Sequence, residues 1–388
     1  MRKIIFDATP LIANKTGVAY YTERLVLAIA AEYKNEVELV GFYYNFLGRH
    51  SVAHLPKRPN IRYTYMPLLP AKVLHQLRRW GIEIPIEILA RQRADFILYP
   101  NFLGWPSLFH TPNAPVIHDL TYLDLPQYVT TRVRGDLTRF VPKTIARANF
   151  VITVSEFSKQ RIAKNYRLDP NKILVTHIPP EAPHKLANAE RRAHLQALGL
   201  DGKHFILFVG TVEPRKNLLT LLDAYTRLPA DIQNKTALVI AGGIGWHCQA
   251  EQEKMTQLQG SGVNIIHLGY VDDIARAALY QSAALFVSAS KYEGFGMPTL
   301  EAMSYGTPCA LSDIPVFHEV AGDAALYFNP TDPADASRQM HALLRNTGRA
   351  QAMREKGLAR AATYRWDVVA RQVMQQIEAA LSAKGSGA

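Results

Sequence analysis

Short runs of β-branched and aromatic residues recur along the chain and are separated by stretches with helical periodicity. The first half contains KIIFDA, VELVGFYY, DFILYP, APVIHD, NFVITVS and KILVTHI, and the second half contains HFILFVG, TALVIAGG, NIIHLG, AALFVSAS, TPCALS and AALYFN. Continuous apolar strands that alternate with helices are typical of parallel sheets covered on both faces. Two such series predict an α/β protein with two doubly wound, Rossmann-like domains.

The predicted boundary between the two series lies in PPEAPHKLANAE, residues 179–190, where proline and polar residues interrupt both patterns. A length of 388 residues also suits two domains of ordinary size. We expect a first domain over residues 1–185, a second over 186–367 and a final helix over 368–388. Doubly wound sheets bind ligands beyond the carboxyl ends of their strands. Two such domains that face each other would therefore share a central cleft, and function should reside in strand-to-helix loops.

Composition excludes several classes of protein. With 48% hydrophobic and 20% charged residues, the chain is neither disordered nor fibrous. No stretch reaches the ~18 uninterrupted apolar residues of a membrane span, so the sequence predicts a soluble or peripheral protein. The two cysteines, Cys248 and Cys309, lack the spacing of zinc or redox sites and are expected to be buried in a protein of the reducing cytosol.

Positive charge is concentrated in the first half of the chain. Residues 1–185 contain 25 Lys and Arg against 14 Asp and Glu, whereas residues 186–388 contain 19 of each. Apolar Val73, Leu74, Leu77 and Trp80 lie among a cluster of cations that suits an anionic membrane surface. A solvated basic helix surface is the plainer alternative, and the motifs that would favour nucleic acid are missing. The clustered cations are Lys57, Arg58, Arg62, Lys72, Arg78, Arg79, Arg91 and Arg93.

Three loops of the first half give weak signals. Gly17 precedes an amphipathic helix whose amides could face an anion, although a plain turn glycine is as good an interpretation. The loop lacks G-x-G-x-x-G, which argues against an NAD-dependent oxidoreductase. His118 lies at the end of the predicted strand APVIHD, at the edge of the expected cleft, where it could bind a sugar hydroxyl or serve only in the structure. Ser155 is best interpreted as a helix N-cap.

The segment HFILFVGTVEPRKN gives a stronger signal. Its strand runs into Gly210, and the cations Arg215 and Lys216 follow immediately before a helix that begins near Asn217. A guanidinium, an ammonium and helix N-termini can stabilise the charge of a departing diphosphate without a metal ion. A solvated basic pair is the alternative.

The most specific segment is SASKYEGFGMPTLEAMSYGTP, in which Glu293 and Glu301 stand eight positions apart. Glu293 falls in the loop, and Glu301 falls about one turn into a helix that starts near Pro298. Between them, Gly294, Phe295 and Gly296 would let the main chain approach a ligand. The amides of the first helical turn could then meet phosphate oxygens; these belong to Met297, Pro298, Thr299 and Leu300.

At these residues the chain resembles glycosyltransferase family 4, the retaining enzymes of the two-domain GT-B fold. The E-x7-E element matches as Glu293 and Glu301, and VIHD, TVSEFSK, VGTVEPRKN and DAALYFNPTDP match in the expected order. The resemblance implies that Glu293 holds donor-sugar hydroxyls, Glu301 the ribose, and Arg215 with Lys216 the diphosphate. It also places His118 near the reacting face of the sugar and Gly17 near the phosphates and the acceptor.

The resemblance further implies a metal-independent transfer with retention at the anomeric carbon, and a final helix that returns to the first domain. The run SDIPVFHEVAGDAALYFNP is most similar to the mannosyl- and rhamnosyl-type members that build bacterial surface polysaccharides. GDP-mannose or a related GDP-6-deoxyhexose is the expected donor, and a lipid-linked glycan at the inner face of the cytoplasmic membrane is the expected acceptor. Gly269, Tyr270 and Val271 would lie at the base, where guanine and uracil are not distinguished.

Three other functions remain open at this point. A UDP-sugar-dependent transferase would share the whole pattern. A nucleotide-sugar epimerase would need acid and base groups at C2 of the sugar. A non-catalytic nucleotide- or glycan-binding protein would not require the complete set of Arg215, Lys216, Glu293 and Glu301.

Overall fold

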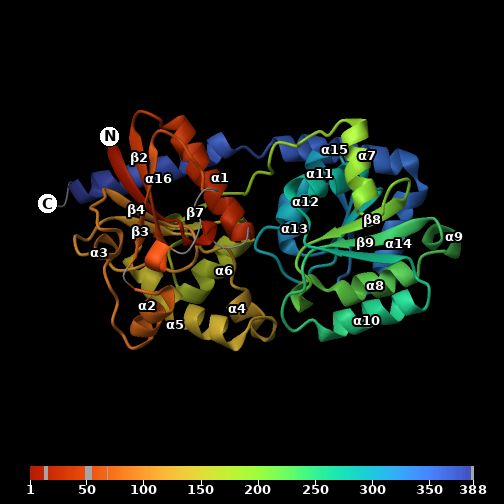
Figure 1. Ribbon diagram of the computed structural model, residues 1–388, viewed down its shortest axis with the longest axis horizontal. Coiled ribbons are helices and arrows are strands. Elements are labelled where there is room, and N and C mark those ends of the chain that lie inside the picture. Colours follow the sequence, from red (N-terminus) through yellow and green to blue (C-terminus); the bar gives the residue numbers. More distant parts are fainter. Residues whose placement is uncertain (13–15, 49–54, 68, 386–388) are drawn as a thin grey trace. The chain divides into compact units, whose positions relative to one another are not determined.

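The computed structural model describes residues 1–12, 16–48, 55–67 and 69–385, which form two compact units (Figure 1). Unit 1 comprises Met1–Asp124, Thr131–Ile178 and Arg365–Ala388, and unit 2 comprises Leu125–Thr130 and Pro179–Tyr364. The short segment Leu125–Thr130 is thus part of unit 2, although the chain on both sides of it belongs to unit 1. Within unit 2, Trp246 Nε1 donates to the carbonyl oxygen of Tyr128 at 2.7 Å.

Unit 1 is built on a parallel sheet with the strand order β3-β2-β1-β4-β5. A parallel bridge between Val116 and Ile152 connects this sheet to the pair β6-β7. The strands are β1 Arg2–Asp7, β2 Val37–Tyr44, β3 Ile61–Met66, β4 Phe96–Tyr99, β5 Asn113–Pro115, β6 Val151–Thr153 and β7 Ile173–Val175.

One strand of unit 1 was not among the predicted runs. Strand β3 reads IRYTYM, and only its two end residues, Ile61 and Met66, are buried. It lies at the edge of the sheet, where one neighbour suffices and polar side chains can face solvent. The buried apolar run that marks a central strand is therefore missing from its sequence.

The helices of unit 1 are α1 Gly17–Glu32, α2 Ala71–Arg79, α3 Ile86–Ala90, α4 Thr121–Asp124, α5 Thr131–Arg147, α6 Glu156–Tyr166 and α16 Trp366–Gly385. Helix α16, the last of the chain, packs against α1, and Arg371 Nη1 pairs with Glu32 Oε2 at 3.1 Å. Helix α6 begins after Ser155, whose Oγ accepts the amide hydrogen of Ser158. The N-cap interpretation of Ser155 is therefore confirmed.

Unit 2 is built on a six-stranded parallel sheet with the order β10-β9-β8-β11-β12-β13. This is the order 3-2-1-4-5-6 of a Rossmann domain, and it reverses direction between β8 and β11. The strands are β8 His204–Val209, β9 Thr236–Ala241, β10 Ile265–Gly269, β11 Leu285–Ser288, β12 Cys309–Ser312 and β13 Ala325–Phe328.

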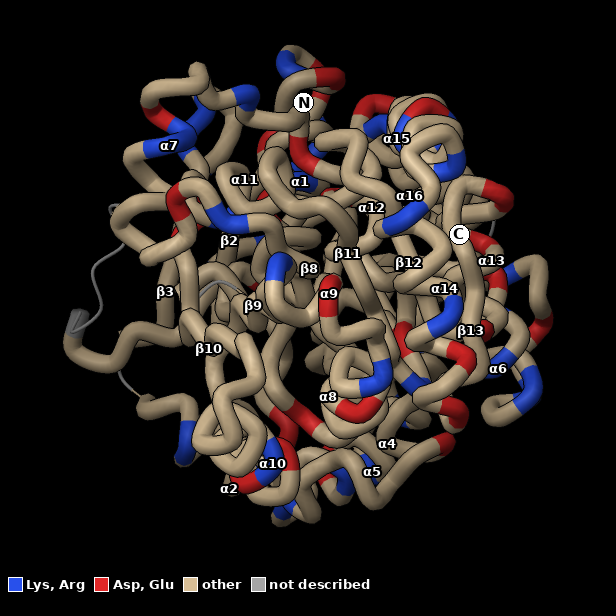
Figure 2. The backbone as a smooth tube through the Cα atoms, turned by 90° about the vertical axis from the view of Figure 1, so that its right-hand side faces the viewer, with Lys and Arg blue, Asp and Glu red and all other residues tan. Residues whose placement is uncertain are grey.

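Helices cover the sheet of unit 2, and their apolar residues complete its core. The central strands carry no charged residue and are drawn entirely in tan in Figure 2, whereas charge is carried by helices and loops. Leu218, Leu221 and Leu222 of α8 pack with Ile206 and Ile240 in one buried cluster. The helices are α7 Asn188–Ala197, α8 Leu218–Thr226, α9 Ala230–Gln233, α10 Gln249–Gly260, α11 Asp273–Ser282, α12 Met297–Ser304, α13 Pro315–Ala321, α14 Pro333–Arg345 and α15 Thr347–Ala362.

Both cysteines are buried and unpaired: Cys248 lies in the core cluster of unit 2 and Cys309 begins β12. The interpretation of both as small apolar core residues is confirmed. No helix in the described ranges is long and apolar enough to cross a membrane.

Candidate active site

The candidate site of unit 2 lies where the strand order reverses. Strands β8 and β11 are neighbours. From β8 the chain continues to β9, and from β11 to β12, and these two strands lie in opposite directions along the sheet. The loops that follow them begin at Gly210 and Ala289, at the carboxyl edge of the sheet. This edge is where open α/β sheets bind ligands.

The loop after β8 is held in shape by its own residues. Gly210 has φ +151° and Asn217 has φ +57°, and the residues between them include a turn of 3-10 helix over Pro214–Lys216. The Asn217 amide, Nδ2, donates to the carbonyl oxygens of Ala289 at 2.9 Å and Pro330 at 2.8 Å. Asn217 therefore ties this loop to the start of the loop after β11.

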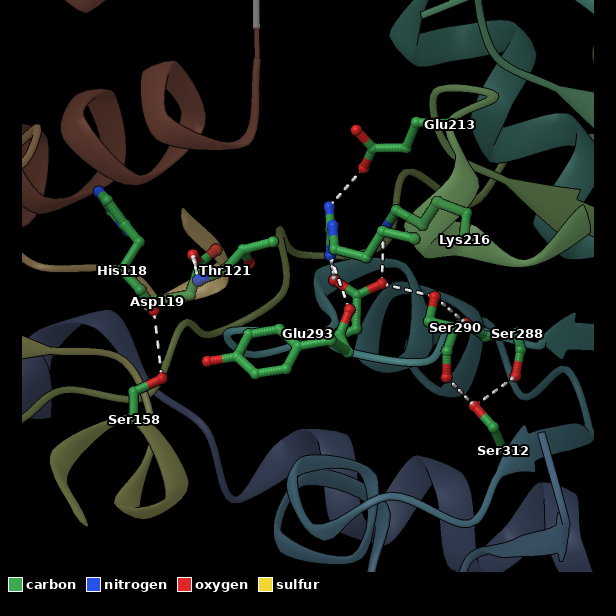
Figure 3. A network of polar contacts seen from close by, with 12 residues as sticks. His118, Asp119, Thr121, Ser158, Glu213, Lys216, Ser288, Ser290, Glu293 and Ser312 are labelled. Atoms are coloured by element: carbon green, nitrogen blue, oxygen red, sulfur yellow. Dashed lines mark hydrogen bonds and ion pairs between the residues drawn. The ribbon is translucent and has the colours of Figure 1, made fainter. Parts of the chain in front are cut away.

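The two loops bring together the charged residues that the sequence indicates (Figure 3). Lys216 Nζ donates to Oε1 of Glu293 at 2.5 Å, and Arg215 Nη1 donates to Oε2 at 2.6 Å. Ser290 Oγ donates to Oε1 at 2.7 Å. Only 7% of the Glu293 side chain is exposed.

This environment keeps Glu293 ionised. Burial alone would raise its pKa, but the charges of Arg215 and Lys216 and the hydrogen bonds from Lys216 and Ser290 outweigh burial and hold the pKa at about 2. Glu293 is therefore a permanent anion at neutral pH, and it cannot donate a proton to a substrate.

Glu213 is a fourth charged residue of this cluster, and it was not predicted from the sequence. Its Oε1 accepts from Arg215 Nη2 at 2.6 Å, and its side chain is 5% exposed. Arg215 Nη1 also donates to the carbonyl oxygen of Tyr292 at 2.9 Å. The guanidinium is thus held between two buried carboxylates and a backbone oxygen. The formal charges of Glu213, Arg215, Lys216 and Glu293 sum to zero.

Three serine residues support the loop that carries Glu293 through hydrogen bonds. Like Glu213, they were not predicted from the sequence. Ser312, at the end of β12, donates its hydroxyl hydrogen to the carbonyl oxygen of Ser290 at 2.5 Å. The hydroxyls of Ser288 and Ser290 are 3.3 Å apart, and all three serines are buried (Figure 3). The S-x-S spacing at the end of β11 was the available signal, because alternate residues point to the same side of an extended chain.

The turn into α12 requires Gly296. Its φ is +92°, and a Cβ atom at this position would lie 2.6 Å from the ring of Phe317 on α13. Helix α12 then begins at Met297, and Glu301 falls one turn in, as predicted. The close packing of Gly296 lets α13 buttress the loop that carries Glu293.

The expected row of phosphate-binding amides from Met297 to Leu300 is only partly correct. Pro298 has no amide hydrogen, so it cannot donate. The amide of Thr299 donates to the carbonyl oxygen of Gly296 at 3.0 Å. Phosphate binding by the amides of Met297 and Leu300 stays a prediction.

Glu301 lies on α12, and two of the expected base-binding residues follow β10. Glu301 Oε2 accepts from Tyr280 Oη at 2.9 Å and lies 3.6 Å from Arg276 Nε, so α11 fixes this carboxylate. Tyr270 and Val271 directly follow β10, which ends at Gly269 with φ +68°. The Tyr270 side chain is exposed.

His118 and Gly17 belong to unit 1. His118 Nε2 lies 2.8 Å from the carbonyl oxygen of Pro100, which can only accept, so the proton resides on Nε2 and Nδ1 carries the lone pair. Burial lowers the His118 pKa, so the ring is neutral at neutral pH. Gly17 is the first residue of α1, and the N-cap Thr16 accepts from Ala19.

Metal ligands do not gather at this site. Among the residues that the structure describes, no group of three or more His, Cys, Asp or Glu side chains is arranged to hold a metal ion. The positive charge of the site comes instead from Arg215 and Lys216 of the loop after β8.

Comparison with known proteins agrees with this geometry. The family of glycosyl transferases group 1 matches residues 190–360. The chain is 30% identical over 387 residues to the O-antigen chain mannosyltransferase B of Escherichia coli, which covers 94% of this chain and 96% of that protein. It is 29% identical over 282 residues to the phosphatidyl-myo-inositol mannosyltransferase of Mycobacterium leprae, covering 69% and 72% of the two chains.

Among solved structures, the sucrose-phosphate synthase of Thermosynechococcus elongatus superposes with a TM-score of 0.75. The match covers 99% of this chain and 100% of that chain at 17% identity, so it shows the shared fold. The chain therefore belongs to the group 1 glycosyltransferases, the family that its sequence resembles, and is a hexosyltransferase of glycan synthesis with the GT-B fold.

Proposed function

We propose that this enzyme transfers mannose, or a related 6-deoxyhexose such as rhamnose, from a GDP-sugar to a lipid-linked or oligosaccharide acceptor of bacterial O-antigen synthesis, with retention at the anomeric carbon. The observation that carries the proposal is the buried carboxylate of Glu293, held by Arg215 and Lys216 at the switch point of unit 2. The choice of mannose is supported by the two relatives, both of which are named mannosyltransferases although their acceptors differ.

The diphosphate of the donor is proposed to bind at Arg215 and Lys216 without a metal ion. An ammonium has three N–H donors, and Glu293 takes one from Lys216. Lys216 can therefore bind phosphate oxygens while it still holds Glu293. The negative charge of Glu293 prevents the loop from being strongly positive before the donor binds. The diphosphate then adds negative charge, which both cations can stabilise.

Glu293 is proposed to bind a hydroxyl of the donor sugar rather than to attack the anomeric carbon. A carboxylate offers about four lone-pair sites, and three are taken by Arg215, Lys216 and Ser290. One more hydroxyl can be accepted, but two adjacent cations withdraw the charge that a nucleophile needs.

Retention then follows from attack on the same face. The bond from the anomeric carbon to the leaving phosphate oxygen breaks while the bond to the acceptor oxygen forms on that side. The acceptor's proton passes to the leaving phosphate oxygen. Neutral His118 is proposed to accept a hydrogen bond through Nδ1 from a hydroxyl of the donor sugar. A 6-deoxyhexose has no hydroxyl at C6 that could donate this hydrogen bond.

A thermal-shift panel of GDP, UDP, ADP and their sugars tests the donor. A ligand at ~100 times its dissociation constant stabilises the folded state by ~2.7 kcal/mol, so GDP and GDP-mannose should raise Tm while UDP and ADP should not. Stabilisation by UDP alone would overturn the donor. Transfer to acceptor, followed by NMR of the anomeric proton, should give a product of retained configuration.

Two other outcomes would replace the proposal. Conversion of the donor to an isomer in the absence of acceptor would indicate an epimerase. Tight nucleotide binding with neither transfer nor slow donor hydrolysis would indicate a binding protein.

We further propose that the enzyme works at the inner face of the cytoplasmic membrane, because a lipid-linked acceptor is anchored there.

A further inference from the structure

The carboxylate of Glu301 is held by the protein through only one of its two oxygens. Oε2 accepts from Tyr280 Oη at 2.9 Å and lies 3.6 Å from Arg276 Nε. Oε1 accepts no hydrogen bond from the part of the chain that the structure describes. The Glu301 side chain is 16% exposed, so a ligand can reach it. One oxygen is thus fixed by the protein, and the other is left for a hydroxyl from outside.

Tyr280 is the direct hydrogen-bond donor to Glu301. It lies on α11, which packs beside α12, the helix that carries Glu301 (Figure 1). Tyr280 is buried. Burial, and then the negative charge of Glu301, raise the pKa of the Tyr280 hydroxyl well above its usual value. The hydroxyl therefore keeps its proton at neutral pH and donates it to Oε2.

The side chain of Tyr280 has little freedom to move. The ring of Tyr305 stacks on it, with ring centres 5.8 Å apart, and the ring of Phe286 lies 6.0 Å away. Thr307 Oγ1 donates to the backbone carbonyl oxygen of Tyr280 at 2.6 Å. A glutamate that is held by such a fixed donor loses less side-chain entropy when a ligand binds.

Arg276 makes a different contribution to the same carboxylate. Its Nε is 3.6 Å from Oε2 of Glu301, which is too far for a hydrogen bond, and its Nη2 pairs with Asp273 at 3.2 Å. Arg276 thus supplies positive charge near Glu301 but does not fix the direction of the carboxylate. The orientation of Glu301 depends on Tyr280.

The order of groups in a nucleotide sugar indicates what Oε1 of Glu301 would meet. Such a donor runs from sugar to diphosphate to ribose to base. In the proposed function, Glu293 binds the sugar, and the two cations of the loop after β8 bind the diphosphate. Glu301 lies one turn into α12, and α11, which holds it, begins two residues after Val271 at the expected base. Glu301 therefore lies between the expected positions of diphosphate and base, where the ribose would be.

We propose that Tyr280 is a positioning residue that, by holding Oε2 of Glu301, directs Oε1 to the ribose hydroxyls and makes the enzyme select ribonucleotides. The proposal deepens the proposed function and rests on it for the identity of the nucleotide. A ligand without ribose hydroxyls leaves Oε1 without a donor in a largely buried place, and the loss of that hydrogen bond costs affinity.

Calorimetric titration of the full chain with GDP and with 2′,3′-dideoxy-GDP tests the selection. The unaltered chain should bind GDP about 10- to 100-fold more tightly, the range for hydrogen bonds to a charged group. Tyr280→Phe keeps the ring and its stacking but loses the hydroxyl. It should weaken GDP binding, leave dideoxy-GDP binding nearly unchanged and reduce the ratio of the two affinities to a few-fold. An equal loss of affinity for both ligands, or an unchanged ratio, would overturn the proposal.

A double-mutant cycle shows whether Tyr280 acts through Glu301. Glu301→Ala removes the carboxylate and should abolish the preference for GDP over its dideoxy form. In that background, Tyr280→Phe should change neither affinity further, because the group that it positions is gone. Losses that simply add in the double variant would mean that Tyr280 acts by another route.

Tyr225 provides a matched control in the same unit. It is a buried tyrosine of α8, and its Oη donates to the carbonyl oxygens of Thr236 at 2.7 Å and Asn264 at 3.1 Å. Tyr225→Phe loses a buried hydroxyl as Tyr280→Phe does, but it should leave the ratio of affinities unchanged. A reduction of the ratio as large as that in Tyr280→Phe would show general loosening of unit 2 and refute the positioning role.

The same titrations with UDP and 2′,3′-dideoxy-UDP separate this proposal from the proposed function. If only the uridine pair binds, and its ratio falls in Tyr280→Phe, the GDP donor is wrong while the role of Tyr280 stands. If GDP binds and GDP-mannose supports transfer, but Tyr280→Phe keeps the full ratio, the role of Tyr280 is wrong while the proposed function stands. Binding of neither nucleotide would overturn both.

Discussion

Lys216 Nζ and Glu293 Oε1 are 2.5 Å apart, although the two residues come from different strand-to-helix loops. Arg215 holds the other oxygen of the same carboxylate at 2.6 Å. The loop after β8 and the loop after β11 are thus joined through one buried anion. A ligand that binds the cations and a ligand that binds the carboxylate would meet the same cluster, which suits a molecule that carries both a diphosphate and a sugar.

Removing either half of this cluster should abolish most of the activity. Glu293→Gln keeps the shape of the side chain but loses its charge, and Arg215→Ala/Lys216→Ala removes both cations. We expect kcat/KM to fall about 100- to 1,000-fold in each case, the range found when a preorganised charge-stabilising group is lost. Circular dichroism should show an intact fold, and near-normal turnover in both variants would refute the site.

The depressed pKa of Glu293 should be visible as acid sensitivity. The pKa is about 2 in the folded protein against 4.5 for an unperturbed glutamate, so folding favours the ionised form. The resulting stabilisation, about 3 kcal/mol, is fully present above pH ~4.5 and is lost as the pH falls from there toward 2. The free energy of unfolding is measured in urea from about pH 7 to pH 3.

Glu293→Gln is the control for that titration. The variant cannot titrate at this position, so its deficit relative to the unaltered chain should be largest at neutral pH and should shrink below pH ~4.5. A deficit that stays constant across the acid range would show that the Glu293 carboxylate is not the group responsible.

Ser290→Ala should impair catalysis through Glu293. The hydroxyl of Ser290 donates to Oε1 of Glu293 at 2.7 Å, and loss of a hydrogen bond to a charged group costs about 1.5–3 kcal/mol. We expect kcat to fall about tenfold or more while KM changes little, because the two cations remain to bind the diphosphate. Steady-state kinetics with varied donor concentration measures the two separately.

A matched serine controls for simple loss of a hydroxyl. Ser282 Oγ is buried on α11 and has no hydrogen-bond partner among the described residues. Ser282→Ala should leave kcat unchanged, and Ser290→Thr, which keeps the donor, should recover part of the activity. If Ser290→Ala and Ser282→Ala behave alike, the hydroxyl of Ser290 does not position Glu293.

The sequence alone predicts that Arg215, Lys216 and Glu293 lie close together, because parallel strands bring their carboxyl ends to one edge of the sheet. It did not reveal Glu213 or Ser312, because a buried acid next to an arginine and a serine at a strand end are ordinary residues until the fold places their partners.

The fold also alters the basic cluster that the sequence predicts in unit 1. Arg78 is 2% exposed and pairs with Glu83 at 2.9 Å, and Leu74 is buried as well. The pairing of Arg79 with Asp136 was hidden from the sequence, since the two residues are 57 positions apart. Both cations are therefore paired within unit 1 and do not add free charge to its surface.

Other differences arise from local rules. The edge strand β3 has polar residues where a central strand has apolar ones, so a continuous apolar run does not mark it. Pro298 lies in the helical turn that is predicted to bind phosphate, although proline has no amide hydrogen. Strand β3 is hidden from the sequence pattern by its tertiary context. The missing amide hydrogen of Pro298, by contrast, follows from the residue type alone.

Two adjacent glycines after β9 should differ strongly in how much stability the same substitution costs. Gly242 has φ +157°, and a Cβ atom there would lie 1.9 Å from the carbonyl oxygen of Gly210, whereas a Cβ at Gly243 meets nothing within 4 Å. Gly242→Ala should therefore destabilise the protein by about 3 kcal/mol, and Gly243→Ala by about 0.5 kcal/mol or less. Urea denaturation measures both.

The same pair tests whether the backbone at Gly210 positions the catalytic cluster. Lys216 packs over Gly210, and its Cε lies 3.6 Å from the Cβ position of that glycine. A shift of Gly210 forced by Gly242→Ala should move Lys216 away from Glu293 and lower kcat in the protein that remains folded, while Gly243→Ala retains full activity. Full activity in folded Gly242→Ala would mean that the loop after β8 adapts, and that Gly242 serves stability alone.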